Sequence, residues 1–551
     1  MMNDWSWLLG IPVLLPFIGA ALCLLFVRHP TIQRAISVAT LTVVCLDACA
    51  ITWLVRNGPI TLDVGGWSAP VGITLVGDRL SALMLLISVA VTLAVLLFSL
   101  PQDIDESQRI PIAVYQPTFL ILSAGVSNAF LTGDLFNLYV GFEILLIASF
   151  VLITLGGTRD RMRAGSIYVI VSVFSSVIFL TALAMVYAAV GTVNLAQIAL
   201  RLPEIDPVVA SLIQAMLFIA FGVKAAVFPL SAWLPDSYPT APAPVTAVFA
   251  GLLTKVGVYA IIRTQTIVFA DRGFHTVISI LGAITMVIGI LGAIAQDDLK
   301  RLLSFTLVSH IGFMLWGVGS GSVDGYAAAI FYTAHHIIVQ TALFLVTGLI
   351  EWKTRTTSLI ALGSMLATSP FIAIVYFIPA LNLAGLPPFS GFIGKIGLIS
   401  ASAVQMDSLS IAMIATGVLS SFLTLYVLIR AWNMIFWQKA DEEIENRPLP
   451  PIMTISTAAL VILSTALSVF GGPAYSYARR AAVELQAQVP YVVAVFPDAQ
   501  RGTGQSHTEN TIEPNSDLAP TIKPPLPTAS PSAKPSSSIE PTPSPSPQES
   551  R

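Results

Sequence analysis

The sequence predicts an all-α, polytopic membrane protein with about fourteen transmembrane helices. Of its 551 residues, 55% are hydrophobic and 10% are charged, and the mean hydropathy is +0.82. Soluble domains are about 25% charged, so this chain cannot cover itself with polar groups in water. Its apolar residues form long runs, and a spanning helix needs roughly 20 of them. No run alternates like a barrel strand, and lipid offers the backbone no hydrogen-bond partners, so each run should be helical.

The predicted helices follow one another from the N-terminus with short connections. The fourteen apolar runs cover residues 5–27, 33–55, 80–100, 117–131, 133–155, 166–190, 208–228, 243–263, 275–295, 303–319, 325–350, 370–400, 408–436 and 452–475. The first run has no basic region before it and no cleavage site, so we interpret it as a retained span. Cys23, Cys45 and Cys49 lie in the first two runs as small hydrophobic residues. They indicate neither a disulfide framework nor a metal site, and no cofactor is expected.

Basic residues in the short loops predict the orientation of the helices. With an extracytoplasmic N-terminus, the cytoplasmic loops hold Arg28, Arg34, Arg109, Arg159, Arg161, Arg163, Lys300, Arg301, Lys353, Arg355, Lys439 and Arg447. The opposite loops hold Arg56, Arg201 and Arg272, with Arg79 and Arg263 at the edges of spans. This bias predicts a multi-pass protein of the cell (inner) membrane with both termini outside the cytoplasm. The net charge is only -3 and the Lys and Arg residues lie mostly in short loops, so no basic surface is expected that could hold a nucleic acid through its phosphates, and nucleic-acid partners are excluded.

The composition changes near Asp498, where proline, serine, threonine and glutamine replace the apolar runs. Such a segment cannot bury enough apolar surface to offset the entropy lost on ordering. Residues 486–551 are therefore predicted to form a disordered, Pro/Ser-rich tail. The tail either is simply solvated or binds a partner.

Two apolar runs are interrupted by proline, one in each half of the chain. The interruptions lie at residues 228–236 (FPLSAWLPD) and 386–391 (LPPFSG). Proline removes a helix hydrogen bond and frees carbonyl groups, which a membrane tolerates only where protein or a watered cavity receives them. A matched pair of breaks is typical of repeated halves with a transport path between them, although two packing kinks would look the same.

Three ionisable side chains inside the runs of the first half are candidates for a proton path. Glu143 lies near the middle of its run, so at 1.5 Å per residue it is expected near the middle of the bilayer. An ionisable group there costs about 2.5–3.5 kcal/mol on insertion scales, so it should face the bundle and have a partner. Lys224, just before the first break, is the natural counter-ion, and Lys255 lies in the middle of the next run. Neighbouring ammonium groups disfavour double protonation, so these lysines could pass protons; each could instead form a static ion pair.

The second half contributes three histidines and another lysine. Imidazole titrates near neutrality and has one donor and one acceptor nitrogen, so His310, His335 and His336 are candidate proton-relay groups or satisfied packing residues. Residues 335 and 336 point about 100° apart, and Gln340 shares a face with His336, which favours His336 for the path. Lys395 follows the second break and is predicted to be the terminal relay group.

Asp47, in the second apolar run, has no role that the sequence explains.

Three segments carry a resemblance to a known family. They are residues 131–143 (LTGDLFNLYVGFE), 224–235 (KAAVFPLSAWLP) and 386–395 (LPPFSGFIGK). With them, the chain resembles the D-type component of Mrp-type multi-subunit sodium/proton antiporters, which are related to the antiporter-like subunits of respiratory complex I. A lysine at position 395 suits the D-type component, whereas complex I relatives with glutamate there differ. The resemblance covers the chain up to about residue 475.

The resemblance implies two inverted five-helix repeats, each with one broken helix. It divides the chain into a three-helix segment (1–116), a first repeat (117–263), a second repeat (275–436) and a last helix (452–475). It assigns the essential carboxylate to Glu143 and relay lysines to Lys224, Lys255 and Lys395. It also implies companion subunits for activity.

Together these observations predict a subunit of a multi-subunit antiporter, which moves protons through a buried Glu/Lys/His relay in exchange for Na⁺ or another monovalent cation. Such a protein is a secondary transporter and not an enzyme. One alternative is a proton-pumping subunit of a complex-I-type NADH or ferredoxin:quinone oxidoreductase, in which redox chemistry elsewhere drives the same relay. Another is a membrane scaffold without a transport path. The sequence indicates neither the Na⁺ site nor the stoichiometry.

Overall fold

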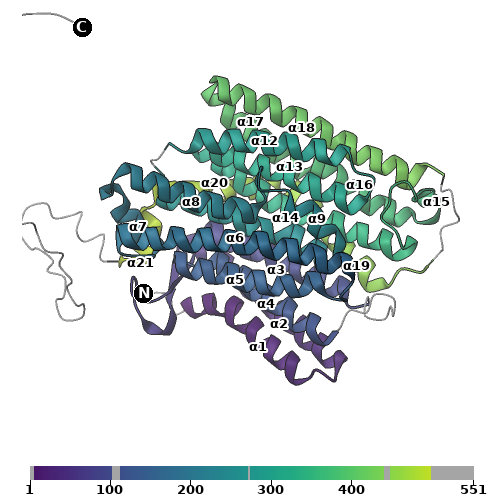
Figure 1. Cartoon of the computed structure of the whole chain (residues 1–551), viewed down its shortest axis with the longest axis horizontal. Helices are drawn as coiled ribbons and strands as arrows, with labels where there is room; N and C mark the ends of the chain where they lie inside the picture. The colour runs from purple at the N-terminus through teal and green to yellow at the C-terminus, as the bar shows by residue number, and fades with distance from the viewer. Residues whose placement is uncertain (1–4, 102–111, 271–272, 440–446, 498–551) are drawn as a thin grey trace, which may run out of the picture. The chain divides into compact units, whose positions relative to one another are not determined.

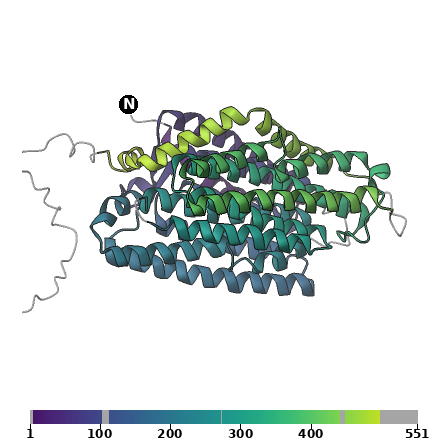
Figure 2. The same cartoon turned by 90° about the horizontal axis from the view of Figure 1, so that it is seen from above.

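The computed structural model describes residues 5–101, 112–270, 273–439 and 447–497. In this part nearly all residues are helical, and the long helices run side by side along one direction (Figure 1), as the view from above also shows (Figure 2). The predicted all-α, polytopic fold class is confirmed. In Figure 1 the purple helices α1 and α2 lie at one edge of the bundle and α17 and α18 at the opposite edge.

The helices of the first half of the chain are α1 (Ile11–Leu25), α2 (Pro30–Leu54), α3 (Arg79–Ser99), α4 (Ile112–Leu131), α5 (Leu135–Thr154), α6 (Arg159–Val190), α7 (Leu195–Arg201), α8 (Pro207–Ala225), α9 (Trp233–Ser237), α10 (Ala243–Val248) and α11 (Thr254–Arg263). Those of the second half are α12 (His275–Ile294), α13 (Leu299–Gly319), α14 (Val323–Thr354), α15 (Met365–Thr368), α16 (Pro370–Ala384), α17 (Ser390–Gln405), α18 (Ser408–Trp432), α19 (Pro451–Val469), α20 (Gly471–Ala487) and α21 (Val489–Val495). Three π-helical stretches, η7 (Phe249–Leu253), η8 (Thr264–Val268) and η9 (Asn433–Trp437), extend α10, α11 and α18.

Twelve helices of the described part are long and apolar enough to cross a membrane. The predicted count of fourteen is not confirmed by this measure. The two runs that do not meet it are α4, which contains Pro117, and the run 370–400, which is divided into α16 and α17. The division falls at the predicted proline break, so each piece is shorter than a span.

Two short strands were not expected. β1 (Ile60–Asp63) and β2 (Thr74–Gly77) pair antiparallel between α2 and α3, with Ile60 opposite Gly77. The strands are rich in β-branched and apolar residues, which favour extended structure, and the segment between them is rich in glycine. The hairpin lies in a connection between predicted helices and leaves the fold class unchanged.

The centre of the bundle consists of α13, α14 and the continuous segment α10–η7–α11–η8, in which nearly every residue is buried. Helices at the edges, such as α2, α6 and α18, keep one exposed apolar face, as expected for helices that contact lipid. Ionisable groups on the central helices therefore lie far from lipid. This placement positions the candidate site.

Carboxylates cap several spans where they begin. Asp78 accepts a hydrogen bond from Ser81 N at 2.8 Å at the start of α3, and Asp134 accepts one from Asn137 N at 2.9 Å at the start of α5. Such caps satisfy backbone groups that the first turn leaves unpaired. Asp78 also forms a buried ion pair with Arg263. Burial raises the pKa of the Asp78 carboxyl, but the Arg263 guanidinium beside it outweighs burial and holds this pKa below its ordinary value.

The C-terminal part of the described chain is helical further than expected. The last span was predicted over 452–475, whereas α19 ends at Val469 and α20 and α21 continue the chain to Val495. Residues 486–497, which the predicted tail includes, lie partly in these two helices. α20 packs against α14 and α3, so it is anchored in the bundle. Residues 498–551, like Arg109 and Arg272 of the predicted loops, lie outside the described part.

Candidate functional site

Glu143 lies in the middle of α5, half-buried, and its Oε1 atom is buried without a hydrogen-bond partner in the chain. Its carboxylate interacts electrostatically with Lys224 on α8 and with Tyr139, one turn earlier on α5. No hydrogen bond or ion pair joins Glu143 to Lys224. The two groups therefore lie within electrostatic range of each other but are not in contact.

Lys224 occupies the last turn of α8, where the first broken helix is interrupted. Its Nζ donates to the carbonyl oxygen of Ser172 on α6 at 3.3 Å and lies 5.8 Å from the centre of the Phe142 ring. The side chain lines a cavity of about 20 Å³. The carbonyl of Val223, in the last turn before the break, accepts hydrogen bonds from Ala226 N and from Trp233 Nε1, both at 3.2 Å. The first break is thus stabilised by an indole and leaves the lysine with few fixed partners.

Lys255 is fully buried on α11, directly after the π-helical stretch η7. Its Nζ donates to the carbonyl oxygen of Ala250 at 2.6 Å. Two residues further on, a Cβ added at Gly257 would lie 2.7 Å from Ala225 N, so only glycine allows α11 to approach α8 here. This approach brings the helices of Lys224 and Lys255 into direct contact.

His310 on α13 and His336 on α14 face each other with ring centres 5.2 Å apart. The Nδ1 atom of His310 lies 2.7 Å from the Tyr332 hydroxyl, and its Nε2 atom lies 3.5 Å from Thr424 Oγ1. Both ring nitrogens of His336 are buried without a partner in the chain. Both histidines interact electrostatically with Lys255. The two imidazoles therefore lie between the lysine of the first half and the groups of the second half.

His335 points to a different partner from its neighbour. Its Nδ1 atom lies 2.9 Å from Ser390 Oγ, and that hydroxyl donates to Asn382 Oδ1 at 3.2 Å. Ser390 begins α17 directly after the second break, and Asn382 lies in the last turn of α16 just before it. His335 also interacts electrostatically with Lys395. The preference for His336 over His335 as the path-lining histidine stays a prediction, because each contacts a different part of the cluster.

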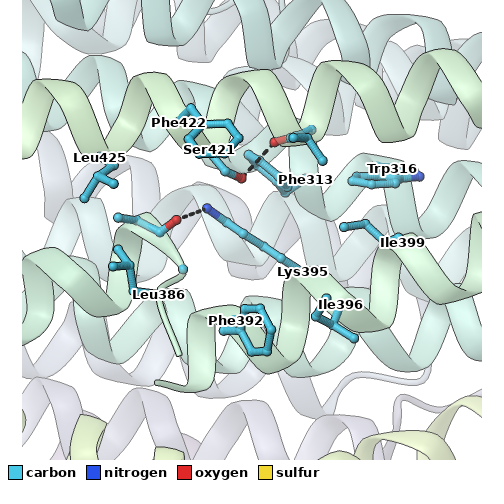
Figure 3. A pocket seen from close by; sticks show the side chains of 14 residues that line it. Phe313, Trp316, Leu386, Phe392, Lys395, Ile396, Ile399, Ser421, Phe422 and Leu425 are labelled. Atoms are coloured by element: carbon cyan, nitrogen blue, oxygen red, sulfur yellow. Dashed lines mark hydrogen bonds between the residues drawn. The ribbon is translucent and has the colours of Figure 1, made fainter. Parts of the chain in front are cut away.

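Lys395 lies on α17 and reaches back to the second break. Its Nζ donates to the carbonyl oxygens of Ala384 at 2.8 Å and Leu383 at 3.3 Å, and it lies 4.9 Å from the centre of the Phe313 ring. Figure 3 shows the side chain crossing a cavity between α17 and α18 with its amine at a carbonyl oxygen. This cavity has a volume of about 190 Å³ and is lined mainly by apolar side chains, including Phe422.

The structure brings the predicted residues together in two groups. Glu143 and Lys224 form the first, and His310, His335, His336 and Lys395 form the second, with Lys255 interacting with the histidines of the second group. Lys224 and Lys255 donate to different carbonyl oxygens and share no hydrogen-bond partner, although their helices touch.

Several residues of this cluster were not predicted from the sequence. Tyr332, Ser390, Asn382 and Thr424 all contact the histidines, or each other beside them, through side-chain oxygens. Tyr332 lies one turn before the histidine pair on α14, which was the available signal. Ser390 lies in the second proline break, which the sequence shows, whereas Asn382 and Thr424 gave no signal.

Asp47 lies on α2, which packs against α1, α3 and α4. It is 6% exposed, and both carboxylate oxygens lack a hydrogen-bond partner in the chain. Nothing in the structure explains it. Among the residues described, no three His, Cys, Asp or Glu side chains gather in a way that could hold a metal ion.

Comparison with known proteins shows the family of the chain. Residues 132–424, more than half of the chain, match the family described as NADH:quinone oxidoreductase/Mrp antiporter, TM. The D component of the Na(+)/H(+) antiporter of Alkalihalophilus pseudofirmus is 38% identical over 89% of this chain and 99% of its own length. The protein of the same name from Bacillus subtilis is 33% identical over the same shares of the two chains.

Two solved structures share the fold. A chain of the Mrp complex from Dietzia sp. DQ12-45-1b superposes with a TM-score of 0.83 and 29% identity, covering 90% of this chain and 100% of that chain. A chain of the membrane-bound sulfane sulfur reductase, an archaeal respiratory membrane complex, gives a TM-score of 0.81 at 25% identity over 89% and 99%. The matched family, the identity over most of the length and the shared fold agree. The chain therefore belongs to the NADH:quinone oxidoreductase/Mrp antiporter family and, within it, to the D-type components of Mrp antiporters.

Proposed function

We propose that this chain is the proton-translocating subunit of a multi-subunit monovalent cation/proton antiporter, with Na⁺ as the exchanged cation. Relatives named as D components of Na(+)/H(+) antiporters and the likeness to a chain of an Mrp complex support this assignment. The protons move through Glu143, Lys224, Lys255, the histidine cluster and Lys395. Companion subunits complete the transport unit.

The observation that carries the proposal is a set of buried polar side-chain atoms without hydrogen-bond partners on the central helices. Between Glu143 and Lys395, the buried atoms without a partner in the chain include Thr254 Oγ1, both nitrogens of His336, His335 Nε2 and Gln340 Oε1. A buried polar group without a partner costs about 1–3 kcal/mol, so a purely structural core avoids such atoms. The position of these five atoms on the central helices, beside the lysines and histidines, favours a hydrated path for protons.

Protons pass between these residues by electrostatic coupling. A proton that reaches Glu143 neutralises the carboxylate and removes its attraction for the ammonium of Lys224. The Lys224 proton is then released toward Lys255, whose added charge acts on His336 and His310. The imidazoles pass a proton on, because each ring can accept at one nitrogen while donating from the other. Lys395 receives the charge next to the second break and releases it at the outlet.

The membrane potential supplies the driving force. Each elementary charge that crosses the membrane is worth about 2.3 kcal/mol per 100 mV. An exchange of more protons than cations is therefore electrogenic and can drive export of Na⁺ against its gradient. With the predicted orientation, both chain termini lie outside the cytoplasm.

The test uses everted membrane vesicles that contain the chain with its companion subunits. Sodium-dependent proton movement is measured for the parent and for Glu143→Gln and Lys395→Ala, at matched expression. We expect both variants to lose at least about 90% of the rate, because each removes a group that must carry charge. Glu204→Gln and Lys439→Ala are the matched controls, because both side chains are exposed at the surface.

Exchange at the parent rate in the Glu143 and Lys395 variants would contradict the relay. Proton movement that requires NADH or reduced ferredoxin with a quinone, and does not respond to Na⁺, would replace the antiporter by the redox-driven alternative. The likeness to a chain of a respiratory membrane complex makes this second measurement necessary.

A further inference from the structure

A basic pocket lies where α2 ends and α3 begins, away from the proton relay. Its volume is about 590 Å³. Four arginines line it, Arg56, Arg79, Arg479 and Arg480, together with a single carboxylate, Glu484. Because four guanidinium groups and one carboxylate share the same concave surface, the pocket carries an excess of positive charge.

The four arginines are held differently. Arg79 forms an ion pair with Glu484 and donates to the carbonyl oxygen of Arg56 at 2.6 Å, so its guanidinium is fixed. Arg479 pairs with Asp324 at 2.9 Å, with both side chains more than half exposed. The side chains of Arg56 and Arg480 make no hydrogen bond or ion pair within the described chain. The only lining carboxylate is thus already used by Arg79, and two guanidinium groups have their donors available.

The pocket lies at the ends of two candidate membrane spans, where lipid headgroups are expected. Two candidate spans meet there, because the span of α2 ends at Asn57 and the span of α3 begins at Arg79. Trp53, one turn before Arg56, is 64% exposed on the outside of α2. Exposed tryptophans are typical of the boundary between the hydrocarbon core and the headgroup region.

Three more exposed tryptophans mark the same end of the bundle. Trp5 and Trp7 precede α1 and Trp67 lies in the hairpin before α3, and all three are more than half exposed. Since α1 starts at the end of the bundle where α2 finishes, these side chains and the basic pocket share one boundary. An apolar side chain on the pocket wall, Val483, is 48% exposed and offers a contact for hydrocarbon.

We propose that this pocket binds the headgroup of an anionic phospholipid. A guanidinium presents paired N–H donors that match phosphate oxygens, and it binds them more strongly than a neutral donor does. Arg56 and Arg480 supply these donors, whereas Arg79, fixed by Glu484, shapes the wall between them. The acyl chains extend along the exposed apolar surface beside Trp53. The proposal is independent of the proton relay.

Lipid retention by the purified protein tests the proposal. The full-length chain, together with any subunits that co-purify, is placed in nanodiscs of phosphatidylcholine alone or with one fifth phosphatidylglycerol, and tightly retained lipids are counted by native mass spectrometry. We expect the parent to retain phosphatidylglycerol and the variant Arg56→Gln/Arg480→Gln to bind it roughly tenfold or more weakly, because each basic residue strengthens the attraction for an anionic lipid. The control Arg159→Gln/Arg163→Gln removes two exposed arginines elsewhere and should match the parent.

Two further arms decide the remaining outcomes. Inorganic phosphate at 10 mM should not displace the retained lipid; displacement would show that the pocket takes a free phosphate and would overturn the assignment of a lipid. Arg56→Lys/Arg480→Lys should recover part of the affinity, because it restores charge without the paired donors. Equal phosphatidylglycerol retention by the parent and by Arg56→Gln/Arg480→Gln, with both proteins intact by size-exclusion chromatography, would overturn the proposal and leave the arginines as solvated surface groups.

Discussion

The two broken helices use their lysines in different ways. At the first break, Trp233 Nε1 donates to the carbonyl of Val223, which also accepts from Ala226 N, and Lys224 is left to interact with Glu143. At the second break, Lys395 itself satisfies the freed carbonyls, and its side chain is in contact with no carboxylate of the described chain. The cavities differ as well, at about 20 Å³ beside Lys224 and about 190 Å³ beside Lys395.

The two breaks therefore differ in how far their hydrogen bonds depend on the lysine beside them. The first lysine can change its protonation state while the break keeps its hydrogen bond from the indole. The second lysine keeps two N–H donors for its two carbonyl oxygens when it is deprotonated, but loss of the amine itself would leave those oxygens unpaired in an apolar environment, which is costly. The structure of the second break therefore depends on the amine of its lysine, whereas that of the first does not.

The largest expected effect comes from replacing each lysine by methionine, which keeps the length of the side chain and removes the ammonium. Lys395→Met leaves the carbonyls of Leu383 and Ala384 without their donor, and we expect a loss of about 3 kcal/mol of stability. Lys224→Met should cost less than about 1 kcal/mol, because Trp233 still caps the break. Denaturant unfolding of the purified protein measures both. Equal destabilisation by the two substitutions would contradict the proposed difference between the two broken helices.

Substituting the residues with a left-handed backbone conformation at the two breaks should change stability by an intermediate amount. Gly385 has a φ of 87°, and a Cβ there would lie 2.7 Å from Lys395 Cδ. Gly385→Ala should cost about 2 kcal/mol from backbone strain and from displacement of the lysine. At the first break the corresponding residue is Ala226 with a φ of 60°, so Ala226→Gly should be neutral or slightly stabilising. Thermal unfolding distinguishes the two, and a stabilising Gly385→Ala would contradict the role of the close contact.

A smaller destabilisation than at Lys395 or Gly385 is expected at the indole of the first break. Trp233→Phe keeps the aromatic packing against Tyr168 and Tyr238 and removes the donor to Val223 O, which should cost about 1 kcal/mol. Antiport by this variant should stay within a few-fold of the parent, because Lys224 and Glu143 are unchanged. Phe313→Leu, which removes the ring under Lys395, is the matched control at the second break. Complete loss of exchange by Trp233→Phe would show that the indole takes part in proton transfer.

The fold class and the identity of the ionisable groups could be predicted because both depend on local composition. A glutamate or lysine within an apolar run is visible in the sequence, as is a proline break. The contacts that organise these groups could not be predicted. His335 meets Ser390 across 55 positions, and the carbonyl that Lys395 reaches depends on how α16 and α17 fold back on each other. The Asp78–Arg263 pair joins residues separated by 185 positions, so no spacing in the sequence indicates it.

The hairpin and the continuation of α19 into α20 were missed for a related reason. Hydropathy identifies long apolar runs, whereas the hairpin is too short to give a run. α20 mixes buried alanines with exposed arginines, so its average hydropathy falls although one face packs on α14.

The π-helical stretch η7 makes this helix tolerant of one particular change in length. A π-helical turn holds one residue more than an α-helical turn, so deleting one residue between Phe249 and Leu253 would restore an α-helical turn and leave the rest of that helix in its orientation. Lys255 would keep its direction toward the histidines, and Gly257 would keep its close approach to α8. Deleting one residue from the α-helical turns beside η7 would instead rotate the rest of the helix by about 100°. Among descendants of this gene, the loss of one residue should therefore occur within η7 and not in the turns beside it.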